Sequence, residues 1–285
     1  MNICRKRLIR ENVSSSPRKL WCAVLFGLLV PLNLFLSGPA PGDEQSAADP
    51  MEKQQSLSER LQSPDPVVAL QAAEEIKRSG YSAQAGILKL AGAINSPNEM
   101  IRLTVIGTLS DLGPAAVPAI PVLIKAISDK DPMIREAAIL ALFSIGRDLE
   151  PAIPSLIHCL GDTSKVVRSS AILVLAKIGK PAIPALIKTL GSGGQVSQSG
   201  AVQALGGIGS PALPELIEVL RKGNKHSAKG ASEALRIIGT PAVEPLIALL
   251  LQGSDREKKR AGETLVLIGA PAVPALVKTL ERKDG

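Results

Sequence analysis

Aromatic residues and cysteines are scarce in this 285-residue chain, which has one Trp, one Tyr, three Phe and three Cys. Beyond residue 40 only Tyr81 and Phe143 remain, so the chain lacks a platform on which nucleic-acid bases or sugars could stack. Cys159 is the only cysteine in the same part, and a single thiol forms no internal disulfide. We therefore expect aliphatic packing to supply the stability.

Positive charge is also scarce once the first 40 residues are set aside. The whole chain has a net charge of +7, but residues 1–40 contribute six basic side chains and one acidic side chain. The remainder has 27 basic and 25 acidic side chains, a net charge of +2. Proteins that bind the phosphate backbone carry a strong positive field, so this balance predicts no nucleic-acid partner.

The N-terminus has the composition of a secretory signal. Six basic residues precede the apolar run Leu20–Leu36, and small residues follow that run. Cleavage after Ala40 would place Pro41 next to the cut and hinder the peptidase, so we expect cleavage after Gly42. This interpretation makes residues 1–42 a signal peptide and predicts export to the periplasm or the extracellular space.

The alternative is an uncleaved anchor. Residues 20–36 would then hold the protein at the inner membrane, and they would be its only contact with a membrane. This run has 17 residues and includes Pro31 and Asn33, whereas a spanning helix needs about 20 apolar residues. After the signal we expect a linker and an N-terminal cap helix over residues 43–62, followed by one domain over residues 63–285.

Seven glycines that end aliphatic runs reveal an internal repeat in that domain. The first three intervals between them are 33 residues and the last three are 30, for Gly80, Gly113, Gly146, Gly179, Gly209, Gly239 and Gly269. A period near thirty is typical of proteins built from stacked repeats. The sequence therefore predicts an all-α fold, a right-handed α-solenoid of about seven helix pairs.

Each repeat predicts two helices. In the first, Asp131–Ile145, apolar residues recur on one face, Asp131 can cap the start, and Gly146 can end the helix in the left-handed conformation. The second is Pro181–Leu190, with Pro181 and Pro184 in its first turn, where proline removes no helical hydrogen bond. The longer repeats have three more residues between the two helices, so we expect a longer turn there and constant stacking between repeats.

A recurring Val/Ile-Arg, Ala, Ala-Leu, Ile-Gly series carries a family resemblance. It reads Ile134-Arg135, Ala138, Ala141-Leu142, Ile145-Gly146, and it starts again at Val167-Arg168. The series resembles HEAT repeats, especially the short PBS lyase type of bilin lyases, over about residues 63–280. The resemblance implies an armadillo-like helical fold. It also implies an alternative function, a bilin-lyase-like or chaperone-like accessory that handles a small hydrophobic ligand.

The arginine of this series does not persist along the chain. It occurs as Arg102, Arg135 and Arg168, and the later repeats carry Gln198, Ala228 and Lys258 instead. We expect the arginines to pair within the chain with loop carboxylates such as Asp131. Such a ladder of ion pairs would lapse toward the C-terminus.

Residues for chemistry are few and scattered. The two histidines, His158 and His226, fall in different repeats, and the chain lacks the His-Glu pairs that hold iron in HEAT proteins resembling deoxyhypusine hydroxylase. Cys159 follows His158, but adjacent helix positions do not face one another, so the pair makes no metal site. Without a Ser-His-Asp or Cys-His arrangement either, we expect no catalysis, no metal and no cofactor.

The function that these features favour is a non-catalytic scaffold for protein–protein interaction. Second helices usually line the concave side of such solenoids, and their outward positions here are small and of mixed charge. That surface suits a helix or an extended peptide of a partner protein. Its expected polar contacts are Lys125, His158, Lys188, Glu215, Glu218 and Lys278. A merely solvated face is the alternative.

A second candidate surface lies on the first helices. Outward positions there are apolar in repeats two to four, at Met100, Leu103, Met133, Leu140 and Leu173. The strip is a possible convex contact for self-association. The alternative is that helix rotation places these side chains against neighbouring repeats.

Overall fold

The computed structural model describes residues 84–281 without a gap, and before them only residues 59, 60, 63, 68, 71, 72 and 75. The predicted signal peptide, residues 1–42, lies outside the described residues. So do Gly80 and nearly all of the predicted linker and cap helix over residues 43–62.

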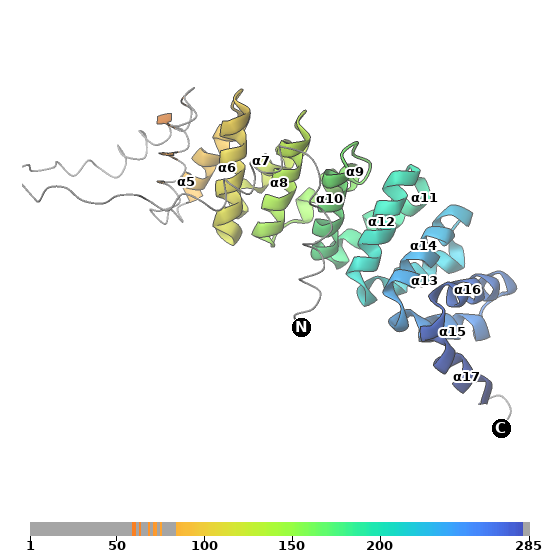
Figure 1. The fold of residues 1–285 in the computed structure, drawn as a ribbon. Coiled ribbons are helices and arrows are strands. Elements are labelled where there is room, and N and C mark those ends of the chain that lie inside the picture. The colour runs from red at the N-terminus through yellow and green to blue at the C-terminus, as the bar shows by residue number, and fades with distance from the viewer. Residues whose placement is uncertain are drawn as a thin grey trace, which may run out of the picture. The chain divides into compact units, whose positions relative to one another are not determined.

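Over residues 99–281 each repeat contains two helices, and no strand occurs within residues 84–281 (Figure 1). The first helices are α6 (Glu99–Leu112), α8 (Pro132–Ile145), α10 (Lys165–Ile178), α12 (Gln195–Ile208), α14 (Lys225–Ile238) and α16 (Asp255–Ile268). The second helices are α5 (Gln84–Gly92), α7 (Ile120–Ala126), α9 (Ile153–Cys159), α11 (Ile183–Ser192), α13 (Leu213–Lys222), α15 (Val243–Gln252) and α17 (Val273–Glu281). Short 3-10 turns lie beside them, at η1 (Ala93–Asn95), η2 (Gly113–Ala119), η3 (Glu150–Ala152), η4 (Lys180–Ala182), η5 (Ser210–Ala212), η6 (Thr240–Ala242) and η7 (Ala270–Ala272).

Contacts join neighbouring repeats in chain order. Each first helix packs against the next first helix, from α6 with α8 through to α14 with α16. The second helices α7, α9, α11, α13 and α15 also pack against the first helix that follows each of them. This nearest-neighbour stacking confirms the predicted α-solenoid.

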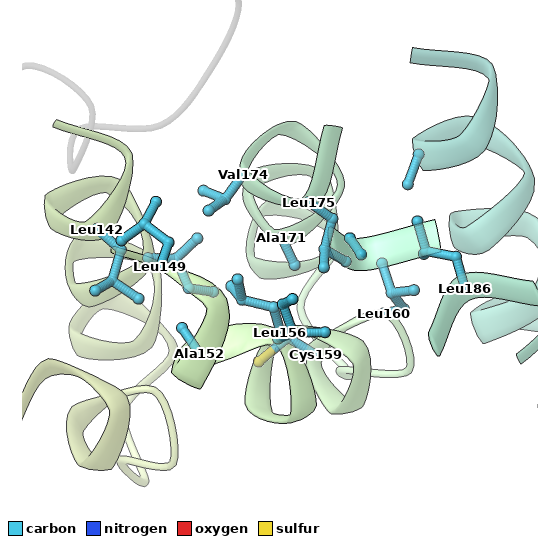
Figure 2. Close-up of a cluster of buried hydrophobic side chains, with 14 of the residues drawn as sticks. Leu142, Leu149, Ala152, Leu156, Cys159, Leu160, Ala171, Val174, Leu175 and Leu186 are labelled. Atoms are coloured by element: carbon cyan, nitrogen blue, oxygen red, sulfur yellow. The ribbon is translucent and has the colours of Figure 1, made fainter. Parts of the chain in front are cut away.

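The hydrophobic core runs from one repeat into the next without a break. Figure 2 shows Leu142 of α8, Leu156 of α9 and Leu175 of α10 in one cluster with Leu186 of α11, and all four are buried. The predicted face of α8 is buried throughout: Ile134, Ala138, Ala141, Leu142 and Ile145. The short helices are stable because the neighbouring repeats cover their apolar faces.

The ends of the first helices follow the expected chemistry, with one difference. Asp131 Oδ1 accepts a hydrogen bond of 2.8 Å from the Met133 N–H and so caps α8. Gly146 ends α8 in the left-handed helical region, at φ 71° and ψ 0°. Gly209 also has a positive φ, 77°, but its ψ of −141° lies in the mirror image of the extended region, which only glycine adopts.

The Pro-Ala segments form a 3-10 turn followed by a helix, rather than the single helix Pro181–Leu190 that we expected. In η4 the Ala182 N–H donates to Gly179 O at 3.0 Å, and α11 begins only at Ile183. Proline has no N–H to donate, so Pro181 fits this tight turn and Pro184 fits the first turn of α11.

The extra residues of the longer repeats lie in the turn between the two helices, as predicted. Arg147, Asp148 and Leu149 separate Gly146 from η3, whereas η4 starts directly after Gly179. Leu149 is buried, so the longer turn adds a side chain to the core.

The predicted pairing of an arginine with a loop carboxylate occurs at Arg135, but the partner is Asp162 rather than Asp131. Arg135 Nε and Nη2 donate to the two carboxylate oxygens of Asp162, at 2.8 and 2.7 Å. Arg135 Nη1 donates to the carbonyls of Asp129 and Lys130, at 2.9 and 3.2 Å. Arg135 thus joins the loop before its own helix to the loop before the next first helix. Asp131 is not its partner, because its carboxylate caps α8.

The stretch Glu99–Ala126 is long and apolar enough to cross a membrane by length and composition alone, and two bent helix pairs pass the same test if each is one span. In the solenoid this stretch is α6, η2 and α7, and α6 ends at Gly113, whose φ of 54° and ψ of −129° are not helical. Ile101, Val105 and Leu109 of α6 are buried in the core. Packing between repeats therefore accounts for its apolar character.

Candidate binding surfaces

One row of side chains runs along the second helices. It consists of the sixth residue of each of these helices from α7 onward: Lys125, His158, Lys188, Glu218, Ala248 and Lys278. All six are exposed. We call these six positions the second-helix row. The helices α9, α11, α13, α15 and α17 contact one another in sequence, so the row is continuous from His158 to Lys278. Glu215 lies three residues before Glu218 on α13 and is also exposed.

The second-helix row mixes charges and small residues. Lys188 of α11 is followed in the row by Glu218 of α13, whose Oε1 lies 2.5 Å from Lys222 Nζ. Because Lys222 is 82% exposed, this ion pair is solvated and opens at little cost. Small residues precede Lys188 on α11, namely Pro184 and Ala185. The row can therefore make polar contacts with an approaching backbone or helix.

The predicted apolar strip is largely exposed. The exposed fractions are 52% for Met100, 50% for Met133, 38% for Leu140 and 48% for Leu173. Leu103 is the exception, since it is half-buried and packs against the core. Its counterpart on α8 is Glu136, where burial raises the pKa of the carboxyl group above its usual value. This position of the first helix is partly covered, so Leu103 does not belong to the exposed strip.

Two valines extend the exposed surface and were missed in the sequence. Met100 and Met133 are the second residues of their helices, and so are Val166 of α10 and Val196 of α12, which are 51% and 53% exposed. We call these four residues the first-helix ridge. A valine beside a core position looks buried in a sequence, and only its place in the repeat reveals its exposure. The same place holds His226 in α14 and Arg256 in α16.

His158 and Cys159 have opposite environments. His158 is exposed, while Cys159 is buried and its thiol pKa is raised to about 11, mainly because burial disfavours the thiolate. Within the part of the chain that the structure describes, no three His, Cys, Asp or Glu side chains stand close enough to bind a metal ion.

These observations define an α-solenoid of stacked helix pairs with exposed rows of side chains along its helices. The family described as HEAT repeats matches residues 55–141, 117–176 and 183–266, so the chain belongs to the HEAT-repeat family. The family described as PBS lyase HEAT-like repeat matches residues 167–192, which confirms the resemblance seen in the sequence. A comparison of the sequence with curated proteins finds no match.

Solved structures of similar fold include natural and designed repeat proteins. An archaeal HEAT-like repeats protein from Thermococcus onnurineus is 14% identical, with 77% of this chain and 98% of that chain covered and a TM-score of 0.44. A designed armadillo repeat protein in complex with the peptide (KR)4 is 17% identical, with 76% and 100% covered and a TM-score of 0.41. The complex of CpcE and CpcF of phycocyanin lyase from a Nostoc species is 20% identical, with 84% and 97% covered and a TM-score of 0.41.

Proposed function

We propose that this chain is a non-catalytic scaffold that binds a helix or extended peptide of a partner protein along the concave side of its solenoid. The observation that carries the proposal is the second-helix row, in which the same position is exposed in the second helices of six successive repeats. Stacked repeats present long continuous surfaces of this kind, and protein binding is their usual use. The polar contacts would come from Lys125, His158, Lys188, Glu215, Glu218 and Lys278.

Capture of partners by the full chain, tagged at its C-terminus, tests this proposal. The bait is incubated with an envelope extract of its source, and bound proteins are identified by mass spectrometry. A triple variant, Lys125→Glu with His158→Glu and Lys188→Glu, reverses the basic half of the row. We expect one dominant protein with the unaltered chain and its loss, by tenfold or more, with the variant.

A matched control separates the row from a general change of charge. Lys130, Lys165 and Lys180 are exposed cations in the same repeats but outside the row. Their triple replacement by Glu adds as many acidic side chains, and it should leave capture unchanged. Equal loss in both variants, or capture that neither variant alters, would count against the row as the binding surface.

The second candidate function is a bilin-lyase-like or chaperone-like accessory for a small hydrophobic ligand. The PBS lyase HEAT-like match over residues 167–192 favours it. Native mass spectrometry of the purified full chain distinguishes the two. A tightly bound small molecule or a visible absorption band would support the accessory, and a bare colourless chain that captures a protein would support the scaffold.

We also propose that the protein is exported. The N-terminal basic segment and the apolar run over residues 20–36 support this proposal. N-terminal sequencing of the tagged protein, recovered from separated cell fractions, tests it. A chain that begins at Asp43 in the soluble envelope fraction fits cleavage, whereas an intact N-terminus in the membrane fraction fits the anchor.

A further inference from the structure

The first part of the solenoid neutralises its own arginines. Arg102 Nε lies 3.2 Å from Asp129 Oδ2, and Arg135 donates two hydrogen bonds to Asp162. Hydrogen bonds from Arg135 and from the Ser164 N–H outweigh the effect of burial and lower the pKa of Asp162. The inter-repeat loops of this part therefore use carboxylates to bind guanidinium groups.

The carboxylate is missing from the later loops. Asp129 and Asp162 occupy the tenth position counted from the start of the second helix, and the same position holds Ser192, then Lys222, then Gln252. Arg168 Nη1 accordingly has only carbonyl acceptors, the oxygens of Asp162 and Thr163 at 2.8 and 3.1 Å. At Lys222 the anionic position of the repeat has become cationic.

Two further arginines converge on that loop. Arg256 Nη2 donates to Gly223 O at 2.9 Å, and Arg260 Nη2 donates to the same oxygen at 3.1 Å. Arg260 Nη1 also donates to Leu220 O at 2.7 Å. Because both guanidinium groups bond the same oxygen, they lie close to each other. Burial first, and then the charge of Arg256, lower the pKa of Arg260.

These residues form a concentrated positive surface at the junction of α13, α14 and α16, which we call the basic corner: Arg221, Lys222, Lys225, Arg256 and Arg260. Segments 221–229 and 255–260 together hold eight basic and two acidic side chains, although the chain beyond residue 40 has a net charge of only +2. Among the described residues, carboxylates contact Arg221 and Lys222, through Glu257 at 3.8 Å and Glu218 at 2.5 Å. Within the same residues no ion pair forms with Lys225, Arg256 or Arg260.

We propose that the basic corner binds an acidic segment of a partner protein, whose carboxylates pair with Arg256 and Arg260, the guanidinium groups that donate to backbone carbonyls in this part of the chain. The inference rests on the proposed scaffold function in taking the partner to be a protein, but it uses a different surface from the second-helix row. Arginine binds carboxylate through two parallel hydrogen bonds, as Arg135 already does with Asp162 in this chain.

The neighbouring surface indicates which residues accompany the acidic ones in such a segment. Val196 of the first-helix ridge is the second residue of α12, and its counterpart in α14, which packs against α12, is His226. One edge of the first helices is therefore apolar at Val166 and Val196 and basic from Lys225 onward. A polypeptide with acidic residues beside aliphatic ones matches both parts, which favours a protein over a lipid surface or a nucleic acid.

Fluorescence anisotropy with the purified full chain tests the proposal. The probe is a short peptide of Asp, Glu and Leu with a neutral dye, and the reference peptide has Asn and Gln in place of the acids. Lys225→Glu with Arg256→Glu reverses two charges of the basic corner without touching the carbonyl contacts of Arg260. Lys130→Glu with Lys165→Glu is the matched control, since Lys165 and Lys225 are both the first residues of their helices.

The proposal predicts binding of the acidic peptide but not of the reference peptide, and binding that weakens as salt is added. The corner variant should bind at least about tenfold more weakly, while the control variant binds like the unaltered chain. Equal weakening in both variants would overturn the proposal, because it would show an effect of net charge alone. So would failure to bind the acidic peptide, or binding only to phosphatidylglycerol vesicles or to a DNA duplex.

These outcomes separate the basic corner from the scaffold function. If the acidic peptide fails to bind while the full chain still captures a protein through the second-helix row, only the present inference fails. If the acidic peptide binds at the corner but capture is insensitive to the row variant, the row is wrong and the corner stands. Circular dichroism melting of each variant confirms that binding is measured on folded protein.

Discussion

The ion pair between Arg135 and Asp162 should be the strongest polar link between successive loops of the solenoid. The two side chains are 13% and 11% exposed, and they share hydrogen bonds of 2.8 and 2.7 Å. Asp162→Asn keeps the size of the side chain and an acceptor for the Ser164 N–H, but it removes the charge. Breaking one partner of a buried pair costs about 3–5 kcal/mol. Because Arg135 keeps its two carbonyl acceptors, we expect Asp162→Asn to lower the free energy of unfolding by about 2–4 kcal/mol.

Asp129→Asn is the matched comparison within the same ladder. Arg102 Nε lies 3.2 Å from Asp129 Oδ2, but the geometry is too poor for a hydrogen bond and leaves this buried atom without one. We therefore expect a loss of only about 1–2 kcal/mol. Urea unfolding gives both values, and hydrogen exchange of α8 and α10 shows whether the loss is local. The reasoning would be refuted if Asp162→Asn lowered the free energy of unfolding by less than about 1 kcal/mol, or if Asp129→Asn lowered it by more than Asp162→Asn does.

The same pair predicts how stability depends on pH. Burial opposes ionisation of Asp162, but the hydrogen bonds from Arg135 and Ser164 outweigh it, so the pKa of Asp162 is lowered in the folded protein. Its contribution is then fully present above the unfolded pKa of about 3.9 and is lost as the pH falls through the folded value. The free energy of unfolding of the Asp162→Asn variant should therefore fall less steeply as the pH is lowered through this range.

Three further predictions concern single positions. In urea unfolding, Gly209→Ala should lower the free energy of unfolding by about 2–3 kcal/mol and Gly146→Ala by about 1 kcal/mol. The reason is that only Gly146 has a conformation that other residues can adopt, so equal losses would contradict this prediction. Cys159, with a thiol pKa of about 11, should react with iodoacetamide at pH 8 only after denaturation, and rapid native alkylation followed by mass spectrometry would disprove its burial. Burial raises the pKa of Glu136, so its ionisation costs stability as the pH rises above the unfolded value, and Glu136→Gln should raise the melting temperature at pH 7; a lower temperature would mean that the carboxylate has a partner.

The helical faces could be predicted because they depend on local periodicity. Ile134, Ala138 and Leu142 recur at helical spacing, and the structure buries all three. The start of α8 at Asp131 was predictable for the same reason, since a helix cap involves only adjacent residues. Local features of this kind therefore predict the helices of each repeat without knowledge of the contacts between repeats.

Contacts between repeats could not be predicted from spacing. Which aspartate meets Arg135 depends on the distance between successive loops, and this distance favours Asp162 over Asp131. The exposure of Val166 and the partial burial of Leu103 depend on the rotation of each first helix against its neighbours. The basic corner depends on two arginines that bond one carbonyl 33 and 37 residues away in the sequence.

Hydrogen exchange of the complex with a captured partner tests the central proposal, that a protein binds along the second helices. The full chain is compared with and without the partner, and protection is read for each helix. We expect protection concentrated in α9, α11 and α13, around His158, Lys188 and Glu218, with α8 and α10 unchanged. Protection confined to the first helices, or absent from the solenoid, would contradict it.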